Sequence, residues 1–200
     1  MTGDLWDPFG RFDSGPDHDF YAQPRLVQHI GDGAIAALRG RYAQLLPGAG
    51  PVLDLMSSWV SHLPEDHPPA IGLGMNTVEL ASNPQLAAWL VHDLNRQPDL
   101  PFATGAFTAT VCAVSVQYQV RPLEVWSEIA RVTQPGGPVI VSFSNRCFPS
   151  KAVGAWMATD DLGHCKLVAT YLHRAGFSDI QAERLASTDD PIYIVWAPSP

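Results

Sequence analysis

The chain has 200 residues, of which 46% are hydrophobic and 16% charged, so it is long and apolar enough to form one globular domain. Its net charge of −8 disfavours nucleic acid and anionic membrane surfaces as partners. Three cysteines without a CxxC pair favour a reducing compartment, and we expect a cytoplasmic protein. No apolar run is long enough for a transmembrane helix, and the acidic N-terminus lacks the pattern of a signal peptide.

The first 30 residues are expected to form an N-terminal arm or lid, loosely packed over its first 20 residues, and residues 31–200 the domain proper. Gly and Pro interrupt this arm, and the first strand that the pattern predicts begins only at Val52. We therefore expect the domain to fold without residues 1–30. Asp32 is expected to cap the helix that follows, which runs to about Leu46.

Beyond that helix, short β-rich segments alternate with segments of helical periodicity. Such alternation predicts a parallel sheet with helices on both faces. The last two strands are joined only by "ASTDDP", so the final strand should be antiparallel. Strands are expected at 52–55, 70–73, 87–92, 108–114, 139–143, 180–185 and 192–196, although "QLAAWL" alone could be helical. Further helices are expected after Asn76 or Thr77, at 122–132 and at 161–175.

The stretch "LPFATGAFTATVCAVSVQYQVRPLEVWSEIARVTQPGGPVIVSFSN" carries a family resemblance. Its order of motifs resembles the class I S-adenosylmethionine-dependent methyltransferases, the type 11 group in particular. The likeness extends over residues 46–197. It implies a Rossmann-like α/β fold, with a seven-stranded, mostly parallel sheet whose last strand is antiparallel, and it implies S-adenosyl-L-methionine as the cofactor.

The cofactor motifs of that family are only partly present. Asp54 matches the acid after the first strand, but the glycines of the usual loop are replaced in "VLDLMSSWV" by Met56, Ser58 and Val60. Gly74 stands where the family carries the acid that binds the ribose, and Asn76 is a candidate to take over those hydroxyl contacts. The resemblance thus proposes as cofactor-binding residues Asp54, Met56, Ser57, Ser58, Trp59, Gly74, Met75, Asn76, Asp93, Leu94 and Ser115.

The turn "DLMSSW" is expected to serve the cofactor by other means than a glycine loop. Ser57 and Ser58 would cap a helix start and point hydroxyl and N–H groups at the cofactor's amino-acid end. Trp59 would line an apolar wall beside the sulfonium. Met56 is expected to take a negative φ, because side chains other than glycine avoid the left-handed region. The structural alternatives are that the serines only cap a helix and that Trp59 only packs.

Acceptor residues are expected after the strands and in the arm, because ligands of open α/β sheets bind beyond the carboxyl ends of the strands. Tyr118 is a candidate to orient the acceptor or to deprotonate it weakly, and Arg146 could pair with a carboxylate. Each of these residues also has an ordinary reading as a core or surface side chain. The catalytic candidates are Tyr118, Tyr21 and Arg25, and the substrate-binding candidates are Tyr21, Arg25, His29, Gln117, Tyr118, Asn145 and Arg146.

Two other clusters are weaker candidates for function. "DDLGHCK" has Asp and His at helical spacing, but no second cluster completes a metal site, so Asp161 as a helix cap with a surface histidine is the better interpretation. Cys147 is more typical of a buried structural cysteine than of a reactive thiol. No metal site is expected.

The sequence leaves two functional hypotheses. The first is an S-adenosylmethionine-dependent methyltransferase that acts on a small-molecule acceptor by in-line displacement in a dry pocket, as a monomer or weak homodimer. The alternative is a protein of the same fold that binds a ligand or partner without catalysis, because the glycines and the ribose acid are missing. A nicotinamide-dependent dehydrogenase is disfavoured, since the chain has no GxGxxG. The sequence does not identify the acceptor.

Overall fold

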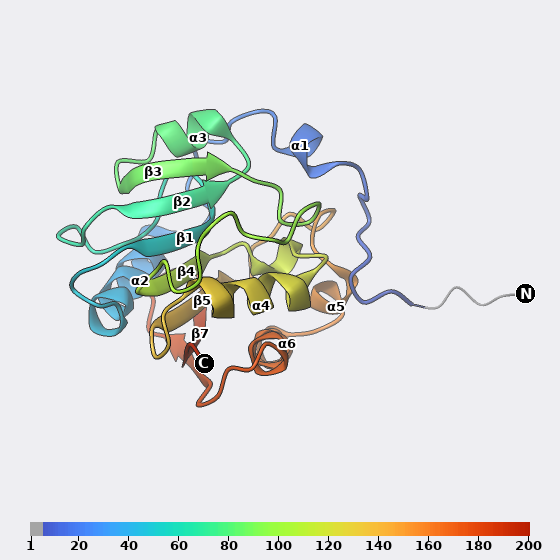
Figure 1. Ribbon diagram of the computed structural model, residues 1–200. Helices are drawn as coiled ribbons and strands as arrows, with labels where there is room; N and C mark the ends of the chain where they lie inside the picture. The colour runs from blue at the N-terminus through green and yellow to red at the C-terminus, as the bar shows by residue number, and fades with distance from the viewer. Residues whose placement is uncertain (1–5) are drawn as a thin grey trace, which may run out of the picture.

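A seven-stranded sheet forms the centre of the protein in the computed structural model, which describes residues 6–200 (Figure 1). The strand order is β3-β2-β1-β4-β5-β7-β6. The strands are β1 (Val52–Ser57), β2 (Ala70–Gly74), β3 (Leu86–Val91), β4 (Ala109–Ala113), β5 (Pro138–Ser144), β6 (Gln181–Leu185) and β7 (Ile192–Pro198). β7 pairs antiparallel with both β5 and β6, and the other pairings are parallel, as predicted.

Helices cover both faces over most of the sheet (Figure 1). On one face α2 buries Leu38 and Tyr42 against Val52 and its neighbours, and on the other α4 and α6 pack Trp126 and Leu172 into a larger core. β3 is the exception, because five of its six residues are exposed. The helices are α1 (Asp17–Phe20), α2 (Asp32–Leu45), α3 (Thr77–Ala81), α4 (Pro122–Val132), α5 (Gly154–Met157) and α6 (Asp161–Arg174), with a 3₁₀ turn at Val116–Tyr118.

The caps of two helices differ from the sequence prediction. Asp32 does not cap α2; Asp189, in the β6–β7 turn, accepts hydrogen bonds from the N–H groups of Gly33 and Ala34 at 2.8 and 2.9 Å. A carboxylate distant in sequence therefore caps this helix, where the sequence pattern had predicted the local Asp32. At α6 the cap is Asp160, whose side chain accepts from the Gly163 N–H.

Asp161 and His164 also have other roles than the sequence suggested. Asp161 accepts a hydrogen bond of 2.6 Å from the Tyr193 hydroxyl. His164 is buried and stacks on Trp156 with 3.8 Å between ring centroids. The expectation of a surface histidine is thus wrong, since this ring is part of the packing between α5 and α6.

The connection from β1 to β2 contains no helix. Residues 58–69 form an irregular loop instead. Ser57 and Ser58 therefore do not begin a helix, and the expected set of outward-pointing N–H groups at a helix start is not formed. α3, after β2, has only five residues, so little of the β2–β3 end of the sheet is covered.

The N-terminal segment is more tightly packed than expected. Phe9 packs against the main core, and the N–H of Gly154 donates to the carbonyl of Gly10 at 2.8 Å. Lys151, only 1% exposed, reaches the Asp17 carboxylate at 3.2 Å and the Gly15 carbonyl at 2.8 Å. The prediction of a loosely packed arm is therefore wrong for residues 8–20, and residues 1–5 lie outside the described part. A deletion of residues 1–30 would leave Lys151 without the partners that compensate its burial.

Candidate functional site

A cavity of about 320 Å³ lies at the carboxyl ends of the strands. It sits where the strand order reverses: the chain runs outward from β1 to β2 and β3, then returns to form β4 on the other side of β1. Crevices at such switch points are the usual binding sites of open α/β sheets. The volume is at the lower end of the range of small-molecule pockets.

Most of the predicted site residues line this cavity. The topology brings them together because β1, β2, β3 and β4 all end at the same edge of the sheet, and the N-terminal segment crosses that edge. The predicted residues that line the cavity are Tyr21, Arg25, His29, Asp54, Met56, Ser57, Ser58, Trp59, Gly74, Met75, Asp93, Leu94, Ser115, Tyr118 and Arg146.

Asn76, Gln117 and Asn145 do not line it. Asn76 is the N-cap of α3, and its amide nitrogen donates to the carbonyls of Tyr21 and Ala22, so its polar atoms are already bound. Gln117 is buried and donates to the Val114 carbonyl. Asn145 is exposed and faces a shallow depression beside α6. The prediction that these three side chains contact cofactor or acceptor is not supported by the geometry.

Three residues of the cavity wall, Met56, Val114 and His62, have backbone conformations that glycine would favour, with φ = 57° at His62 in the loop after β1. Met56, at the end of β1, has φ = 57°, and Val114, just after β4, has φ = 46°. The expectation of a negative φ at Met56 is therefore wrong. Each left-handed residue other than glycine costs about 1–2 kcal/mol, and such strain is typically found at functional sites. The turn thus keeps a glycine-like backbone although the glycine is gone.

Asp54 is buried in the floor of the cavity and 2% exposed. The hydroxyls of Ser57 and Ser61 both donate to its Oδ2, at 2.5 and 2.6 Å. Within residues 6–200 no hydrogen bond reaches Oδ1, which leaves one carboxylate oxygen for a ligand. Burial raises the pKa of Asp54 to about 6, and the two serine hydroxyls oppose that rise.

Glu79 is a buried acid that the sequence analysis missed. Its Oε1 accepts from the Arg25 N–H at 2.7 Å, and its Oε2 accepts from the Ser58 hydroxyl at 2.6 Å. It therefore joins the N-terminal segment to the turn after β1, and it lines the cavity near Gly74, where the family's ribose acid is missing. The signal that could have found it is its place one turn after the Asn76 cap, on the inner face of α3.

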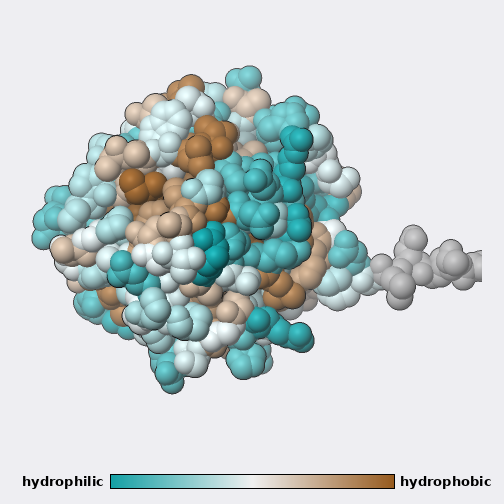
Figure 2. Space-filling model, viewed as in Figure 1, coloured by the Kyte–Doolittle hydropathy of each residue, from teal (hydrophilic) through white to brown (hydrophobic). Residues whose placement is uncertain are grey.

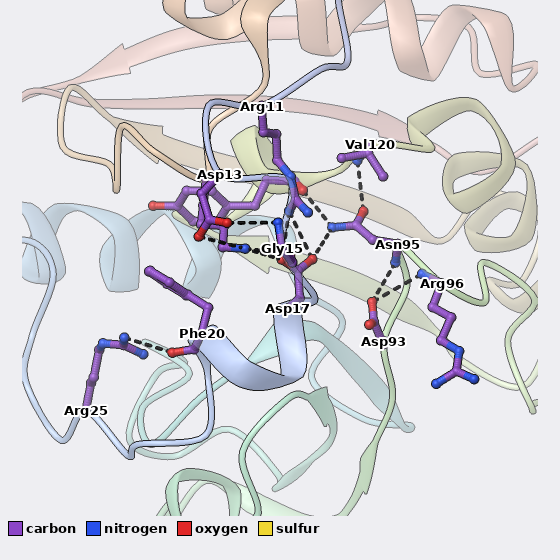
Figure 3. Close-up of polar contacts among 12 residues, drawn as sticks. Arg11, Asp13, Gly15, Asp17, Phe20, Arg25, Asp93, Asn95, Arg96 and Val120 are labelled. Atoms are coloured by element: carbon purple, nitrogen blue, oxygen red, sulfur yellow. Dashed lines mark hydrogen bonds and ion pairs between the residues drawn. The ribbon is translucent and has the colours of Figure 1, made fainter.

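The N-terminal segment forms one wall of the cavity through Tyr21, Arg25 and His29. The Arg25 guanidinium lies 4.5 Å from the Phe20 ring centroid and donates to the Phe20 carbonyl at 2.9 Å (Figure 3). Burial, and then the charge of Arg25, lowers the pKa of His29, although Glu79 opposes it. Arg25 is held by aromatic rings, and within residues 6–200 no carboxylate pairs with its guanidinium.

A polar network fastens this wall to the rest of the fold. Figure 3 shows Asp17 between Arg11 and Asn95, with Asn95 also bound to Val120. Although burial opposes it, hydrogen bonds from Arg11 and Asn95 keep the pKa of Asp17 below its ordinary value. Asn95 and Asp17 both line the cavity and were not predicted. The network links α1, the loop after β3 and the turn after β4.

An adjoining part of the wall carries Tyr118, Phe148 and Arg146, and the Phe148 ring packs against Phe20 and His29 of the N-terminal segment. The Tyr118 hydroxyl accepts the Phe148 N–H at 2.9 Å, and burial raises its pKa to about 12. Tyr118 is therefore a poor base, but its own O–H remains able to donate to a ligand. Arg146 pairs with Asp190 at 2.7 Å, and burial raises the pKa of the Cys147 thiol.

The charge of the cavity is set by its carboxylates. His62, in the loop after β1, is buried and lines the cavity. Burial, and then the charge of Arg39, lowers its pKa to about 4, so it is neutral near pH 7. With Arg146 paired, the acids Asp54, Glu79 and Asp93 outweigh Arg25. Such a cavity suits a ligand with positive charge.

No group of three or more His, Cys, Asp or Glu side chains among residues 6–200 is arranged to hold a metal ion. Over the same residues, no helix has both the length and the apolar character to cross a bilayer.

Known proteins resemble this chain in sequence and in fold. A family model described as a methyltransferase domain matches residues 72–141. The chain has the class I methyltransferase fold. No curated protein sequence matches it significantly.

Solved structures with the methyltransferase fold resemble the chain over most of its length. An S-adenosylmethionine-dependent methyltransferase of Thermotoga maritima aligns with TM-score 0.63 and 12% identity, over 84% of this chain and 90% of that chain. The [4+2]-cyclase SpnF aligns with TM-score 0.64 and 16% identity, over 92% and 91%. Phosphoethanolamine N-methyltransferase 2 of Haemonchus contortus, in complex with S-adenosyl-L-methionine, aligns with TM-score 0.59 and 13% identity, over 85% of this chain and 53% of that chain.

Proposed function

We propose that the protein is an S-adenosylmethionine-dependent methyltransferase that acts on a small-molecule acceptor. One observation carries this proposal: the cavity at the β1–β4 switch point is framed by Met56 and Val114, both in strained left-handed conformations. A backbone of this kind is retained only where the fold over-determines it, and here it opens space for a ligand beside Asp54.

The residues of the cavity fit this cofactor. The free Oδ1 of Asp54 is suited to the ammonium of the methionine end, and Asp93 and Leu94, directly after β3, are suited to the adenosine end. Glu79 and the backbone of Gly74 replace Asn76 as the candidates for the ribose side. When bound, the cofactor supplies an electrophilic methyl group on a positively charged sulfur. The three acids favour that charge, and neutral His62 does not oppose it.

The acceptor is proposed to enter between Tyr118 and the N-terminal wall. Tyr118 can donate its O–H to orient the acceptor, while its raised pKa disfavours the role of proton acceptor. Tyr21 and Arg25 also line the cavity and would exclude water once a ligand is bound. Arg25 and His29 remain candidates for contact with the acceptor. A reaction governed by alignment suits an acceptor that is already a good nucleophile.

The alternative is a protein of this fold without methyl transfer. Two observations favour it: the hydroxyls of Ser57 and Ser58 are engaged by Asp54 and Glu79, and a solved structure of this fold is named as a cyclase. The two proposals differ in one measurement. Incubation with methyl-labelled S-adenosylmethionine and a metabolite fraction below 3 kDa should release S-adenosylhomocysteine in stoichiometric amount with a labelled product. Tight binding of the cofactor without its consumption by any fraction would instead support the alternative.

A further inference from the structure

Arg25 lines the cavity and has one guanidinium nitrogen without a hydrogen-bond partner. Its Nη2 donates to the Phe20 carbonyl, whereas Nη1 is buried and makes no hydrogen bond within residues 6–200. Arg39 and Arg41 also have one such buried nitrogen each, but both of their guanidinium groups pair with glutamates. A buried charged donor is costly when it is left unpaired, so the Nη1 of Arg25 calls for a partner that a ligand can supply.

The contacts of Arg25 place its guanidinium on the side of the cavity where the acceptor is proposed to enter. Glu79, beside β2, accepts only the backbone N–H of Arg25. The guanidinium lies among aromatic rings, 4.5 Å from the centroid of Phe20 and 5.5 Å from that of Phe148, which follows β5. The Phe148 N–H in turn donates to the Tyr118 hydroxyl. The residues proposed for the cofactor lie at the ends of β1, β2 and β3, away from β5 in the strand order.

The N-terminal segment covers this part of the cavity with a polar outer side and an aromatic inner side. In α1, His18 and Asp19 are exposed, and Figure 2 shows a mainly hydrophilic surface over this helix. Phe20 instead packs edge-on against Phe148, with 5.4 Å between ring centroids. An ionic contact made beneath this cover is weakened less by water and salt than one at the surface.

The charges of the cavity are separated between its two sides. The three acids that suit the cofactor's positive charge lie at the β1–β3 side, whereas the Arg25 guanidinium reaches the β5 side. Lys151, whose Nζ also lies over the Phe20 ring, is paired with two aspartates, and Arg146 is paired with a third. Arg25 therefore offers a single uncompensated positive charge. A carboxylate matches that charge, whereas a phosphate dianion would need a second free cation.

We propose that the methyl acceptor carries a carboxylate and that Arg25 binds this group, with Nη1 as a donor. The aromatic rings hold the guanidinium in place, so little freedom is lost when the carboxylate binds. The carboxylate is not the group that is methylated, because its charge is held by Arg25. A second nucleophilic group of the same molecule forms the bond to the methyl carbon as the carbon–sulfur bond breaks, and it gives any proton it carried to solvent.

The inference rests on the proposed function only where it calls the ligand a methyl acceptor. The anion site itself is tested without methyl transfer, by NMR titration of benzoate and its neutral analogue benzamide in the presence of S-adenosylhomocysteine. Benzoate should bind wild type about tenfold more tightly or better, and Arg25→Met should lose this preference. Arg174→Met, a matched control at an exposed position on α6, should keep it. Equal binding of both probes to wild type, or a preference that persists in Arg25→Met, would overturn the proposal.

The cofactor also carries a carboxylate, and the same variant separates the two ligands. Calorimetry should show that Arg25→Met binds S-adenosylhomocysteine with an affinity within about threefold of wild type. Arg25→Lys keeps the charge and should retain part of the benzoate preference, which a purely structural role of the side chain does not predict. A loss of cofactor affinity of about tenfold or more in Arg25→Met would assign this arginine to the cofactor and overturn the proposal.

Methyl transfer shows whether the acceptor uses this site. The metabolite fraction below 3 kDa is divided by anion exchange at pH 7, and each part is incubated with methyl-labelled S-adenosylmethionine. Labelled product should arise from the retained, anionic part, and Arg25→Met should lower the rate at limiting acceptor about tenfold or more. Transfer to the unretained part alone would overturn the proposal. No transfer to either part, with the benzoate preference intact, would overturn the proposed function and leave the anion site standing.

Discussion

Met56 and Val114 lie at the carboxyl ends of the adjacent strands β1 and β4 and share a left-handed backbone, with φ of 57° and 46°. Neither residue type favours this conformation, and the β-branched Val114 favours it least. Both line the cavity. The protein therefore holds strain on both sides of the switch point, and it does so without the glycines that would relieve it.

This strain predicts that Met56→Gly is more stable than Met56→Ala, the reverse of the usual order. At an ordinary position, glycine is less stable than alanine by about 0.5–1 kcal/mol. At a positive φ the order reverses, because alanine keeps the strain and glycine removes it. Met56→Gly should therefore unfold with a free energy about 1 kcal/mol higher than Met56→Ala in urea titrations. Met75 also lines the cavity but has no positive φ, and there alanine should be the more stable of the pair. Alanine more stable than glycine at both positions would contradict the left-handed turn.

The buried Asp54 predicts a pH dependence of cofactor binding. Burial raises its pKa to about 6, and an ammonium group binds the ionised form. The affinity for S-adenosylhomocysteine, measured by calorimetry, should be level above pH 7 and fall about tenfold per unit well below pH 6. Asp54→Asn should remove this dependence. An affinity that rises below pH 6 in the wild type would show that the ligand does not meet the ionised carboxylate.

The same group affects stability with the opposite sign. Because its folded pKa lies above the value of 3.8 for an unperturbed aspartate, its contribution favours folding most at low pH. That contribution is lost as the pH rises through about 6. In the absence of ligand, the difference in unfolding free energy between wild type and Asp54→Asn should shift in favour of wild type as the pH falls from 7 to 5. Urea titrations at both pH values measure it, and a shift in favour of the variant would contradict the raised pKa.

The contacts of Lys151 predict how much stability is lost when its bonds to the N-terminal segment are removed. It is 1% exposed and bound to Asp13, Asp17 and the Gly15 carbonyl. Removal of one partner of a buried ion pair typically costs about 3–5 kcal/mol. Lys151→Met should lose stability in that range, whereas Lys166→Met, at the exposed second lysine, should lose less than about 0.5 kcal/mol. Equal stability of the two variants would show that residues 8–20 are not fastened to the core.

The contacts of Glu79 predict that its substitution changes the rate at which the cofactor dissociates. It ties Arg25 to Ser58, and a glutamine there keeps only one of the two acceptor oxygens. If the N-terminal segment acts as a lid, Glu79→Gln should speed dissociation of S-adenosylhomocysteine about tenfold in stopped-flow fluorescence. The exposed Glu65→Gln serves as the control and should dissociate like wild type. An unchanged rate in Glu79→Gln would count against the lid.

Local patterns in the sequence were sufficient to predict the strands of the sheet. Alternating β-rich and helical segments predicted all seven strands, and the short "ASTDDP" connection predicted the antiparallel β7. Most cavity residues could be predicted for the same reason, because the ends of parallel strands meet at one edge. The positions after β1 and β4 follow from strand boundaries alone, without knowledge of their side-chain contacts.

The errors concern interactions between residues far apart in the chain. Asp189 caps α2 from 155 positions away from Ala34, and a local rule selects Asp32 instead. The cap of α3 was expected at Asn76 or Thr77 and is Asn76, whose amide also donates to the Tyr21 carbonyl and is not free for a ribose. The prediction of a negative φ at Met56 was wrong because tertiary packing, and not the preference of the residue type, sets the backbone there. Glu79 was missed because its burial depends on the N-terminal segment that covers it.

The central claim is that the cavity binds S-adenosylmethionine through Asp54. Calorimetric titration of S-adenosylhomocysteine into wild type, Asp54→Asn and the exposed control Asp66→Asn at pH 7.5 tests it most directly. We predict a dissociation constant in about the micromolar range for wild type and control, and a constant at least tenfold higher for Asp54→Asn, a loss of about 1.4 kcal/mol or more. Absence of binding to the wild type at millimolar ligand, or equal affinity in a folded Asp54→Asn variant, would contradict the account.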